Sequence, residues 1–284
     1  MAIFSNQATL TVNGNATNSN IAYGEILDVL TATKTAVEDS YTPNGIVTYV
    51  VTLRNTGNVT LSGLSVTDDL GGYLFNGTTI YPLTYEADSA TLFVNGVLQA
   101  APSVLEGPPL VVSGISIPSG GDAVLVYQAR ANSYADPTPA GTINNTVSVT
   151  GDGLSSPVTA TETVTIELAP MLSISKSITP AQVVDNDRVT YTFVIQNYGN
   201  QEIVATDDAV ITDTFDPVLT ALAVVFDGTS WTQGVQYNYD QVSGVFSTLP
   251  GQIVVPAATY TQDPVTGAYT SAPGIAVMTV SGTI

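Results

Sequence analysis

Apolar and polar residues alternate along most of this chain, which is the period-2 pattern of half-buried β-strands. The clearest stretches are short, rich in Val, Ile, Thr and Tyr, and bounded by Gly, Pro or Asn: residues 46–54, 61–68, 110–117, 123–131, 143–150, 158–166, 172–178, 189–196 and 275–280. No stretch has the 3.6-residue period of a long amphipathic helix. The pattern therefore predicts an all-β protein.

One segment of this pattern occurs twice. Residues 34–58 and 176–200 align without a gap, at an offset of 142 residues; both begin at a lysine, continue through Val-Thr-Tyr and end in an Asn-x-Gly-Asn turn. Many short strands with turns between them, in two copies, predict two tandem immunoglobulin-like β-sandwich domains. The expected division is an N-terminal donor strand or hairpin with its linker (1–30), a first sandwich (31–170) and a second sandwich (171–284).

The two copies are out of register with the ends of the sequence. In the first copy, residues 122–132 lead through a loop rich in Pro and Gly to a closing strand at 143–150, whereas the second copy ends at the counterpart of 122–132. The second copy thus lacks a counterpart of the closing strand at 143–150. Residues 3–12 form an additional predicted strand of this kind ahead of the first copy, followed by a turn at Asn13-Gly14. We expect residues 3–12 to complete the second domain of a neighbouring subunit by β-strand addition; the alternative is that they fold back onto their own second domain.

Such a contact would join each subunit to the next copy of the same chain. A head-to-tail contact of this kind does not close, so it predicts a fibre. The expected interface residues lie on the N-terminal strand and on the last strand of the chain: Ile3, Phe4, Asn6, Ala8, Leu10, Val12, Ile275, Val277 and Thr279.

The composition narrows the possible functions. Five Lys and Arg residues stand against 24 Asp and Glu, a formal charge of −19, so the chain has no basic face for nucleic acid or for an anionic membrane. Cys and His are absent, which excludes disulfides, thiolate metal sites and histidine bases. No apolar run is long enough to span a membrane, and the first residues do not form a signal peptide. We expect an extracellular location on a cell or spore surface, reached by another route or after removal of a leader.

Lys34 and Lys176 are the only lysines, and each occupies the same position of the repeat. A lysine, an aspartate and an asparagine on adjacent strands are the components of an intramolecular isopeptide bond, similar to those of Gram-positive pilins. The expected sets are one from the first copy and one completed by a neighbouring subunit: Lys34, Asp68 and Asn145; Lys176, Asp213 and Asn6 of the next chain, which aligns with Asn145.

The chemistry of this bond depends on burial. An apolar environment disfavours the ammonium form, so the lysine amine becomes a nucleophile. The same environment is expected to keep the aspartate protonated, so that it polarises the asparagine amide and passes protons while ammonia leaves. Such a reaction turns over once and needs no cofactor, so the chain is not expected to be an enzyme. The alternative is an ordinary buried ion pair, without any covalent bond.

Four short motifs, K-T followed by V-T-Y, N-x-G-N, V-T-D and I-x-N-T-V-x-V, carry a resemblance to a known family. In two copies over nearly the whole chain, they resemble the bacterial surface repeat known as domain of unknown function 11 (DUF11). The resemblance implies β-sandwich stalk modules of cell-surface proteins, often in tandem. It implies architecture and location more than activity.

The remaining candidates are weaker. Asp68-Asp69 and Asp207-Asp208 are carboxylate pairs, but adjacent residues on a strand point to opposite faces. Acidic loops at 38–39 and 185–187 could bind calcium. Trp231, Tyr237 and Tyr239 could form a sugar-binding platform, although such aromatics more often pack in a hairpin. Two functions from different classes therefore remain: a structural filament subunit, or a surface adhesin module that binds glycan or protein.

Overall fold

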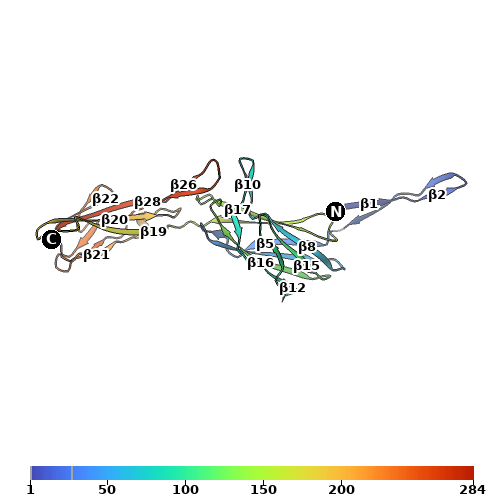
Figure 1. The fold of residues 1–284 in the computed structure, drawn as a ribbon, viewed down its shortest axis with the longest axis horizontal. Coiled ribbons are helices and arrows are strands. Elements are labelled where there is room, and N and C mark those ends of the chain that lie inside the picture. Colours follow the sequence, from blue (N-terminus) through green and yellow to red (C-terminus); the bar gives the residue numbers. More distant parts are fainter. Residues whose placement is uncertain (1, 27) are drawn as a thin grey trace. The chain divides into compact units, whose positions relative to one another are not determined.

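The computed structural model describes residues 2–26 and 28–284; of residues 2, 3, 25 and 26 it describes the backbone alone. These residues form 28 β-strands and one short 3-10 turn, η1 (Ala205–Asp207), so the all-β prediction is confirmed (Figure 1). No helix in the described part of the chain is long and apolar enough to cross a membrane. The chain divides into two units, Met1–Asp136 with Gly141–Ile166 and Pro137–Ala140 with Glu167–Ile284.

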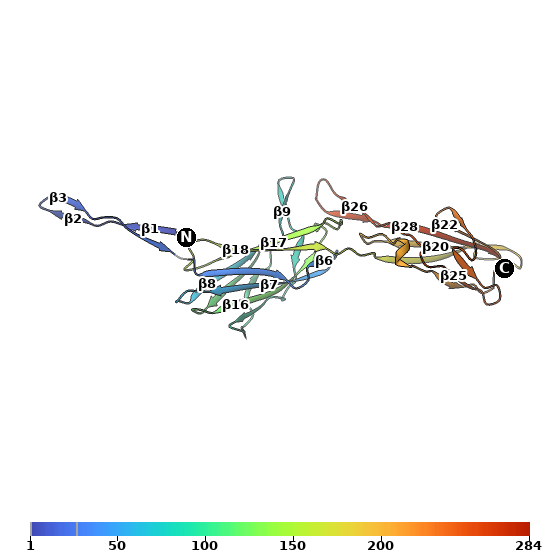
Figure 2. The ribbon, with the colours of Figure 1, turned by 180° about the vertical axis from the view of Figure 1, so that it is seen from behind.

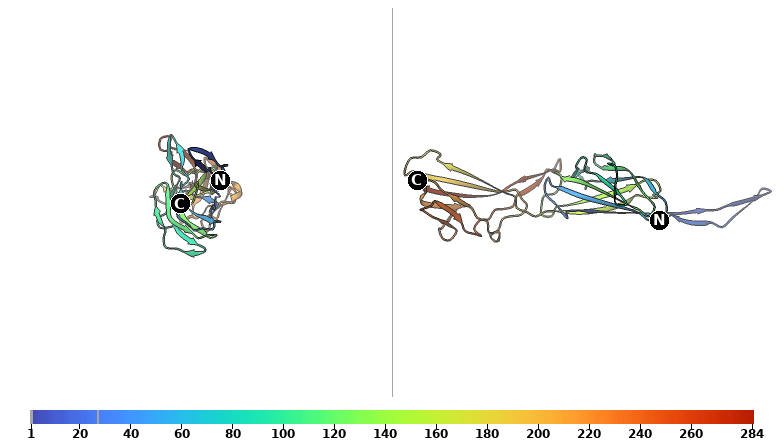
Figure 3. Two further views of the ribbon diagram at one scale, coloured as in Figure 1. Left: turned by 90° about the vertical axis from the view of Figure 1, so that its right-hand side faces the viewer. Right: turned by 90° about the horizontal axis from the view of Figure 1, so that it is seen from below.

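Residues 2–26 form a two-stranded ribbon, the N-terminal arm, drawn in dark blue in Figure 3. β1 (Ala2–Asn6) pairs with β4 (Ala22–Ile26), and β2 (Thr9–Val12) pairs with β3 (Asn15–Asn18). The strand predicted over residues 3–12 is thus divided into β1 and β2, and it pairs within the arm. All side chains of residues 4–23 are exposed, so the alternating pattern of the arm is not used to form a core in this chain.

The rest of the first unit is a sandwich of two sheets. One has the order β13 (Val97–Leu98), β12 (Thr91–Val94), β16 (Asp122–Ala131), β7 (Ile46–Asn55) and β5 (Leu30–Ala36), with β11 (Leu83–Tyr85) also paired to β16. The other has the order β14 (Ser103–Leu105), β15 (Leu110–Ile117), β8 (Leu61–Asp68), β17 (Thr142–Thr150), β18 (Val158–Ile166) and β6 (Ser40–Tyr41). A further hairpin consists of β9 (Tyr73–Phe75) and β10 (Thr78–Ile80). The inward faces of both sheets form one apolar core.

Two turns have the chemistry that tight hairpins require. Asn13-Gly14 joins β2 to β3, and Asn95-Gly96 joins β12 to β13. All four residues have positive φ, between 49° and 82°. Asn and Gly tolerate this left-handed conformation, which matches the twist of the flanking strands. The turn predicted at Asn13-Gly14 is confirmed.

The second unit has one larger and one smaller sheet. The larger has the order β19 (Leu172–Thr179), β20 (Arg188–Asn197), β28 (Gly274–Thr283), β22 (Thr220–Phe226) and β23 (Thr229–Trp231). The smaller has the order β21 (Thr212–Thr214), β25 (Val245–Thr248) and β24 (Tyr237–Tyr239), and a separate hairpin pairs β26 (Thr259–Gln262) with β27 (Tyr269–Ala272). Aromatic and aliphatic side chains from both sheets form its core.

The two units differ at one edge of the smaller sheet. In the first unit β8 pairs with β15 on one side and with β17 on the other. Figure 2 labels β8, β17 and β18 in this unit. In the second unit β21, which carries the corresponding V/I-T-D motif, pairs with β25 alone among the described strands. No described strand of the second unit corresponds to β17 and β18, so its smaller sheet has an open edge.

The C-terminal strand is not that open edge. Ile275, Val277 and Thr279 lie on β28, which pairs with β20 from Gly274 to Thr283 and with β22 from Met278 to Thr283. Thr279 therefore has a strand on both sides, and the Val277 carbonyl accepts the Asp227 N–H. Of the two strands, β21 is the one with a described neighbour on one side only, so the open edge lies on β21.

Candidate functional site

Lys34 and Asp68 meet in the interior of the first unit. Lys34 is on the inward face of β5 in one sheet, and Asp68 ends β8 in the other. The Lys34 Nζ atom lies 2.6 Å from Asp68 Oδ2, and the two side chains are 0% and 2% exposed. The Tyr127 hydroxyl donates to the same Oδ2 atom, and the Leu70 N–H donates to Oδ1 at 2.7 Å. The carboxylate therefore holds the lysine in one position.

The rings of Tyr49 and Tyr127 lie close to the amine of this lysine. Lys34 Nζ lies 4.6 Å from the ring centroid of Tyr49 and 5.9 Å from that of Tyr127, and the two rings stack at 5.7 Å. Burial lowers the pKa of Lys34, an effect that the neighbouring Asp68 partly opposes. Burial also raises the pKa values of Tyr49 and Tyr127, so both hydroxyls stay protonated. The site favours a neutral lysine amine more than water does.

Asn145 completes the set on β17, the strand next to β8. It is fully buried, two residues before Val147, which pairs with Asp68. Its Oδ1 atom accepts the Gly71 N–H at 3.2 Å, and its Nδ2 group makes no hydrogen bond of good geometry among the described residues. The Tyr49 hydroxyl also makes none. The Asn145 side chain does interact with the Tyr49 and Tyr127 hydroxyls, where it lowers their pKa values against the effect of burial. A buried polar group without a good hydrogen bond costs about 1–3 kcal/mol, so its retention needs a reason.

The second unit holds the same ion pair in a more open setting. Lys176 on β19 contacts Asp213 Oδ2 on β21, and the Thr214 N–H donates to Oδ1 at 2.9 Å. The side chains of Lys176 and Asp213 are 39% and 18% exposed. Lys176 Nζ lies 4.6 Å from the Tyr191 ring centroid. Asn6, the asparagine expected for this lysine, is an exposed residue of the N-terminal arm in the first unit and lies opposite Ala22.

An apolar groove lies in the second unit between β19 and the residues just before β21. This acceptor groove has a volume of about 200 Å³, and its wall is largely aliphatic: Leu172, Ile174, Ile195, Val210, Ile211 and Ile253. In the first unit Leu30, the counterpart of Leu172, is 3% exposed, whereas Leu172 is 50% exposed. Val147, Val149 and Val164, on β17 and β18, are buried in the core of the first unit, and no described strand of the second unit corresponds to these two strands.

Sequence reasoning found the lysines and carboxylates but missed the tyrosines. Tyr49 and Tyr191 belong to the repeated V-T-Y motif, so they could have been found from the repeat. Tyr127 could not, because the residue paired with Tyr191 in the second unit is Val280. The second lysine site therefore has no counterpart of the Tyr127 ring and hydroxyl.

The other candidates have structural roles. Asp69 Oδ1 accepts the N–H groups of Gly71 and Thr146, so it points away from Asp68 and fastens β17 to β8. Tyr237 and Tyr239 are buried in the core, and Trp231 stacks on Phe226 with the ring centroids 4.9 Å apart. These aromatics pack and do not form a platform, as the packing interpretation predicts.

The acidic residues form no evident metal site. Within the described residues no three His, Cys, Asp or Glu side chains lie close enough to hold a metal ion. In the two acidic loops, Glu38 accepts the Thr48 N–H and Asp187 accepts the Val184 N–H. Asp207 likewise accepts the Val204 N–H at the start of η1. These carboxylates fasten local turns.

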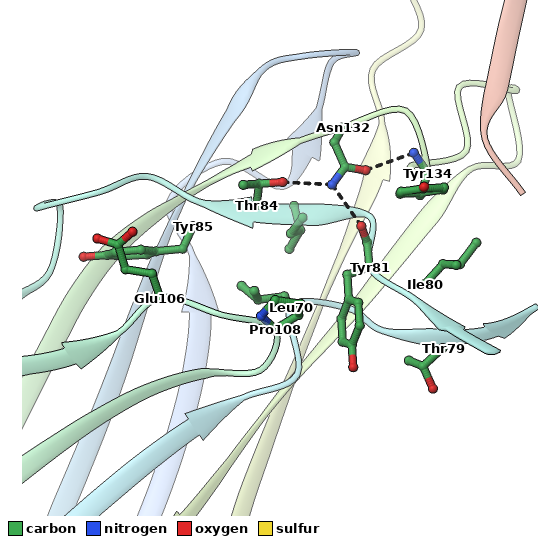
Figure 4. A pocket seen from close by; sticks show the side chains of 11 residues that line it. Leu70, Thr79, Ile80, Tyr81, Thr84, Tyr85, Glu106, Pro108, Asn132 and Tyr134 are labelled. Carbon is green, nitrogen blue, oxygen red and sulfur yellow. Dashed lines mark hydrogen bonds between the residues drawn. The ribbon is translucent and has the colours of Figure 1, made fainter. Parts of the chain in front are cut away.

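A separate pocket of about 320 Å³ lies in the first unit, near the start of β11 (Figure 4). Asn132 reaches over it: its Nδ2 group donates to the Tyr81 carbonyl and to Thr84 Oγ1, and its Oδ1 accepts the Tyr134 N–H. The polar groups of Asn132 are therefore already paired within the protein. The rings of Tyr81 and Tyr85 and the carboxylate of Glu106 also line the pocket.

Comparisons with known proteins gave matches among solved structures alone. No protein-family model matches it, and neither does any curated protein sequence. Among solved structures, the pilus backbone protein RrgB from Streptococcus pneumoniae aligns with 86% of this chain at 9% identity and a TM-score of 0.35. The major pilin SpaD from Corynebacterium diphtheriae aligns with 85% at 13% and 0.36. A collagen-binding domain of a Staphylococcus aureus adhesin aligns with 48% at 10% and 0.31, and the alignment covers 97% of that domain.

The chain spans little more than half the length of the two pilins, 55% of RrgB and 58% of SpaD. Similarity at these identities and TM-scores supports no shared function. The argument for function therefore rests on the geometry of the site.

Proposed function

We propose that this protein is a structural subunit of a filament on a cell or spore surface, and that it polymerises head to tail. Each subunit inserts its N-terminal arm into the acceptor groove of the next. The observation that carries the proposal is a matched pair of incomplete features, an arm with an unused apolar face and a sandwich with an unpaired edge. Folded proteins normally cover such an edge, because unpaired backbone groups invite association.

The arm has the side chains that the groove requires. Phe4, Leu10 and Val12 lie on one face of its first strand and are exposed, Leu10 to 69%. Removing such apolar surface from water, together with new hydrogen bonds along β21, would stabilise the docked arm. Because the arm and the groove are different surfaces of one chain, the contact repeats without closing and extends into a fibre.

Covalent bonds could lock this filament. In the first unit, the Lys34 amine attacks Cγ of Asn145: the Nζ–Cγ amide bond forms, the Cγ–Nδ2 bond breaks, one proton passes from Nζ to the departing group through Asp68, and ammonia leaves. The buried pair and the Nδ2 group without a good hydrogen bond support this reaction. In the second unit Lys176 would react in the same way with Asn6 of the inserted arm. The filament would then be covalently continuous without cysteine.

A second candidate function is a surface adhesin module that binds glycan or protein. The 320 Å³ pocket with its tyrosine rings is the observation that favours it. Aromatic rings beside a carboxylate suit a polar ligand with an apolar face. In that case the protein acts as a binding module and needs no polymer.

Electron microscopy of the purified protein tests the proposal against this alternative. We expect filaments from the intact chain and none after deletion of residues 1–12. Filaments that persist after the deletion would contradict strand donation. Monodisperse monomers that bind a glycan array would favour the adhesin.

A further inference from the structure

The N-terminal arm is a pair of antiparallel strands, and β17 and β18 are a comparable pair within the first unit. There, β17 pairs with β8, and β18 pairs with β17 and packs against β5. We propose that the arm docks into the second unit of another copy as an intact hairpin, with β1–β2 in the place of β17 and β3–β4 in the place of β18. This inference rests on the proposed function and specifies what is inserted.

The first strand of the arm matches β17 without a gap. Residues 4–11 align with residues 143–150, and the asparagines at 6 and 145 coincide. The buried face of β17 carries Ile143, Asn145, Val147 and Val149, and the corresponding face of the arm carries Phe4, Asn6, Ala8 and Leu10. Asn6 pairs with Ala22 and Thr9 pairs with Asn18. Between these two pairs the first strand of the arm covers three residues and the second strand covers four, so the second strand contains one extra residue. The irregularity is therefore in the second strand, and the alternation of the first is unbroken.

The opposed side chains of the arm also match those of β17 and β18. Phe4 lies opposite Gly24, as Ile143 lies opposite Val164. A Cβ atom on Gly24 would lie 2.2 Å from the Phe4 ring, so the ring occupies the space that a side chain at position 24 would need. One large and one absent side chain replace two of middle size, which keeps the filled volume similar.

The second unit has bare surface that one inserted strand would leave exposed. In the first unit β18 pairs in parallel with β6, with Thr165 opposite Ser40, and covers β5. The counterpart of β6 is residues 182–183, where Val183 and Val184 are exposed, the latter to 72%. Every residue of β19 is exposed as well. These surfaces are what a second strand in the place of β18 would cover.

The match between the arm and the β17–β18 pair predicts which residues of the docked arm pair with β21. In the first unit Val147 pairs with Asp68 and Ser148 with Thr67. Transferred to the docked arm, Ala8 pairs with Asp213 and Thr9 with Thr212. Asn6 then lies two residues from the partner of Asp213, as Asn145 lies two residues from the partner of Asp68 in the first unit. In the second strand, position 25 lies opposite Gln182, as Thr165 lies opposite Ser40.

Because the chain has no cysteine, engineered cysteine pairs report this register cleanly. The full-length variant Thr9→Cys/Thr212→Cys should form intermolecular disulfides on oxidation, seen as a reducible ladder after Asn6→Ala and Asn145→Ala have removed any isopeptide bond. Ser148→Cys/Thr67→Cys is the matched control and should crosslink within one chain. Thr9→Cys/Thr214→Cys, a two-residue slip on the same face, should crosslink much less. A disulfide within one chain for the Thr9/Thr212 pair would overturn donation between copies.

The pair Glu25→Cys/Gln182→Cys, in the same background, tests the second strand. A ladder from this pair as well as from the Thr9/Thr212 pair supports docking of the whole hairpin. A ladder from the Thr9/Thr212 pair alone means that one strand is donated, which overturns this inference and leaves the proposed function standing. Monomers from both pairs, with no filaments of the unmodified protein, would overturn both. Filaments without either ladder would place the contact elsewhere and overturn the hairpin.

Discussion

A lysine that is fully withdrawn from water is costly, and Lys34 is held by one carboxylate and two tyrosine rings. The Asn145 Nδ2 group, which makes no hydrogen bond of good geometry, adds a second cost at the same place. An ordinary ion pair accounts for the lysine and the aspartate but not for the asparagine. The isopeptide proposal accounts for all three residues, because this Nδ2 group is the one that leaves.

The first prediction concerns this bond. Intact-mass measurement of the unmodified protein should show the loss of one ammonia for Lys34–Asn145, and Asn145→Ala should abolish that loss. The variant should also lose roughly 4 to 5 kcal/mol of unfolding free energy, by analogy with a disulfide that closes a loop of about 100 residues. Asn144→Ala, at the exposed neighbouring position, is the control and should keep the mass loss. An unmodified protein with the full calculated mass would contradict the bond.

The second prediction concerns pH, in the Asn145→Ala background where Lys34 stays free. Because burial lowers the pKa of Lys34 below 10.5, the unfolded chain binds more protons in the interval between the two pKa values, so the unfolding free energy should rise with pH there. The raised pKa values of Tyr49 and Tyr127 act oppositely above pH 10, where the unfolded chain loses their protons first. Urea denaturation over a pH series should show the rise followed by a fall. Adding Lys34→Met should remove the rise; a rise that survives it has another source.

At the scale of elements, β8 and β21 carry the same motif but have different neighbours. The Phe215 N–H and the Ile211 carbonyl bond toward β25, so the N–H and C=O groups of Thr212 face the other, open edge. In the first unit this edge is used, and the Asp69 N–H donates to the Thr146 carbonyl of β17. The two units therefore differ in that β17 pairs with this edge of β8, whereas no described strand pairs with the same edge of β21.

The third prediction follows from that geometry. Thr212→Pro removes an N–H that points to the open edge, without removing a bond to β25, so it should abolish polymerisation and leave the second unit folded. Thr212→Val keeps the N–H and is the matched control that should polymerise. Electron microscopy and far-UV circular dichroism would measure the two effects. Normal filaments from the proline variant would show that β21 does not receive the arm.

At the scale of the whole molecule, the first unit is closed by its own β17 and β18, whereas the second has an open edge and an uncovered groove. In the proposed filament, the arm of a second copy supplies the counterpart of these closing strands. A subunit that carries both a donor and an acceptor polymerises when the two cannot meet within one chain.

The fourth prediction concerns a chain in which the arm can reach the acceptor groove of its own second unit. Moving residues 2–26 from the N-terminus to a position after Ile284, through a flexible linker at least as long as residues 132–141, should give a self-complemented monomer. It should form no filaments and should unfold at a higher temperature than the same chain without the arm, because the groove is filled. Size-exclusion chromatography and calorimetry would test this. Placing Leu10→Asp in the moved arm is the control and should remove the gain in stability; an equal gain with Leu10→Asp would mean that the arm does not enter the groove.

The sequence by itself determined the all-β class and the tight turns, because alternation and Asn-Gly pairs act over a few residues. The repeat identified both lysines and the asparagine that completes the first set, since equivalent positions in a repeat have equivalent surroundings. It could not identify Tyr127, which the repeat does not share, nor place the open edge on β21 rather than β28. Which edge of a sheet is paired depends on contacts between strands far apart in the chain. Only the tertiary structure decides that, and here it leaves one edge of β21 without a partner among the described strands, near the acceptor groove.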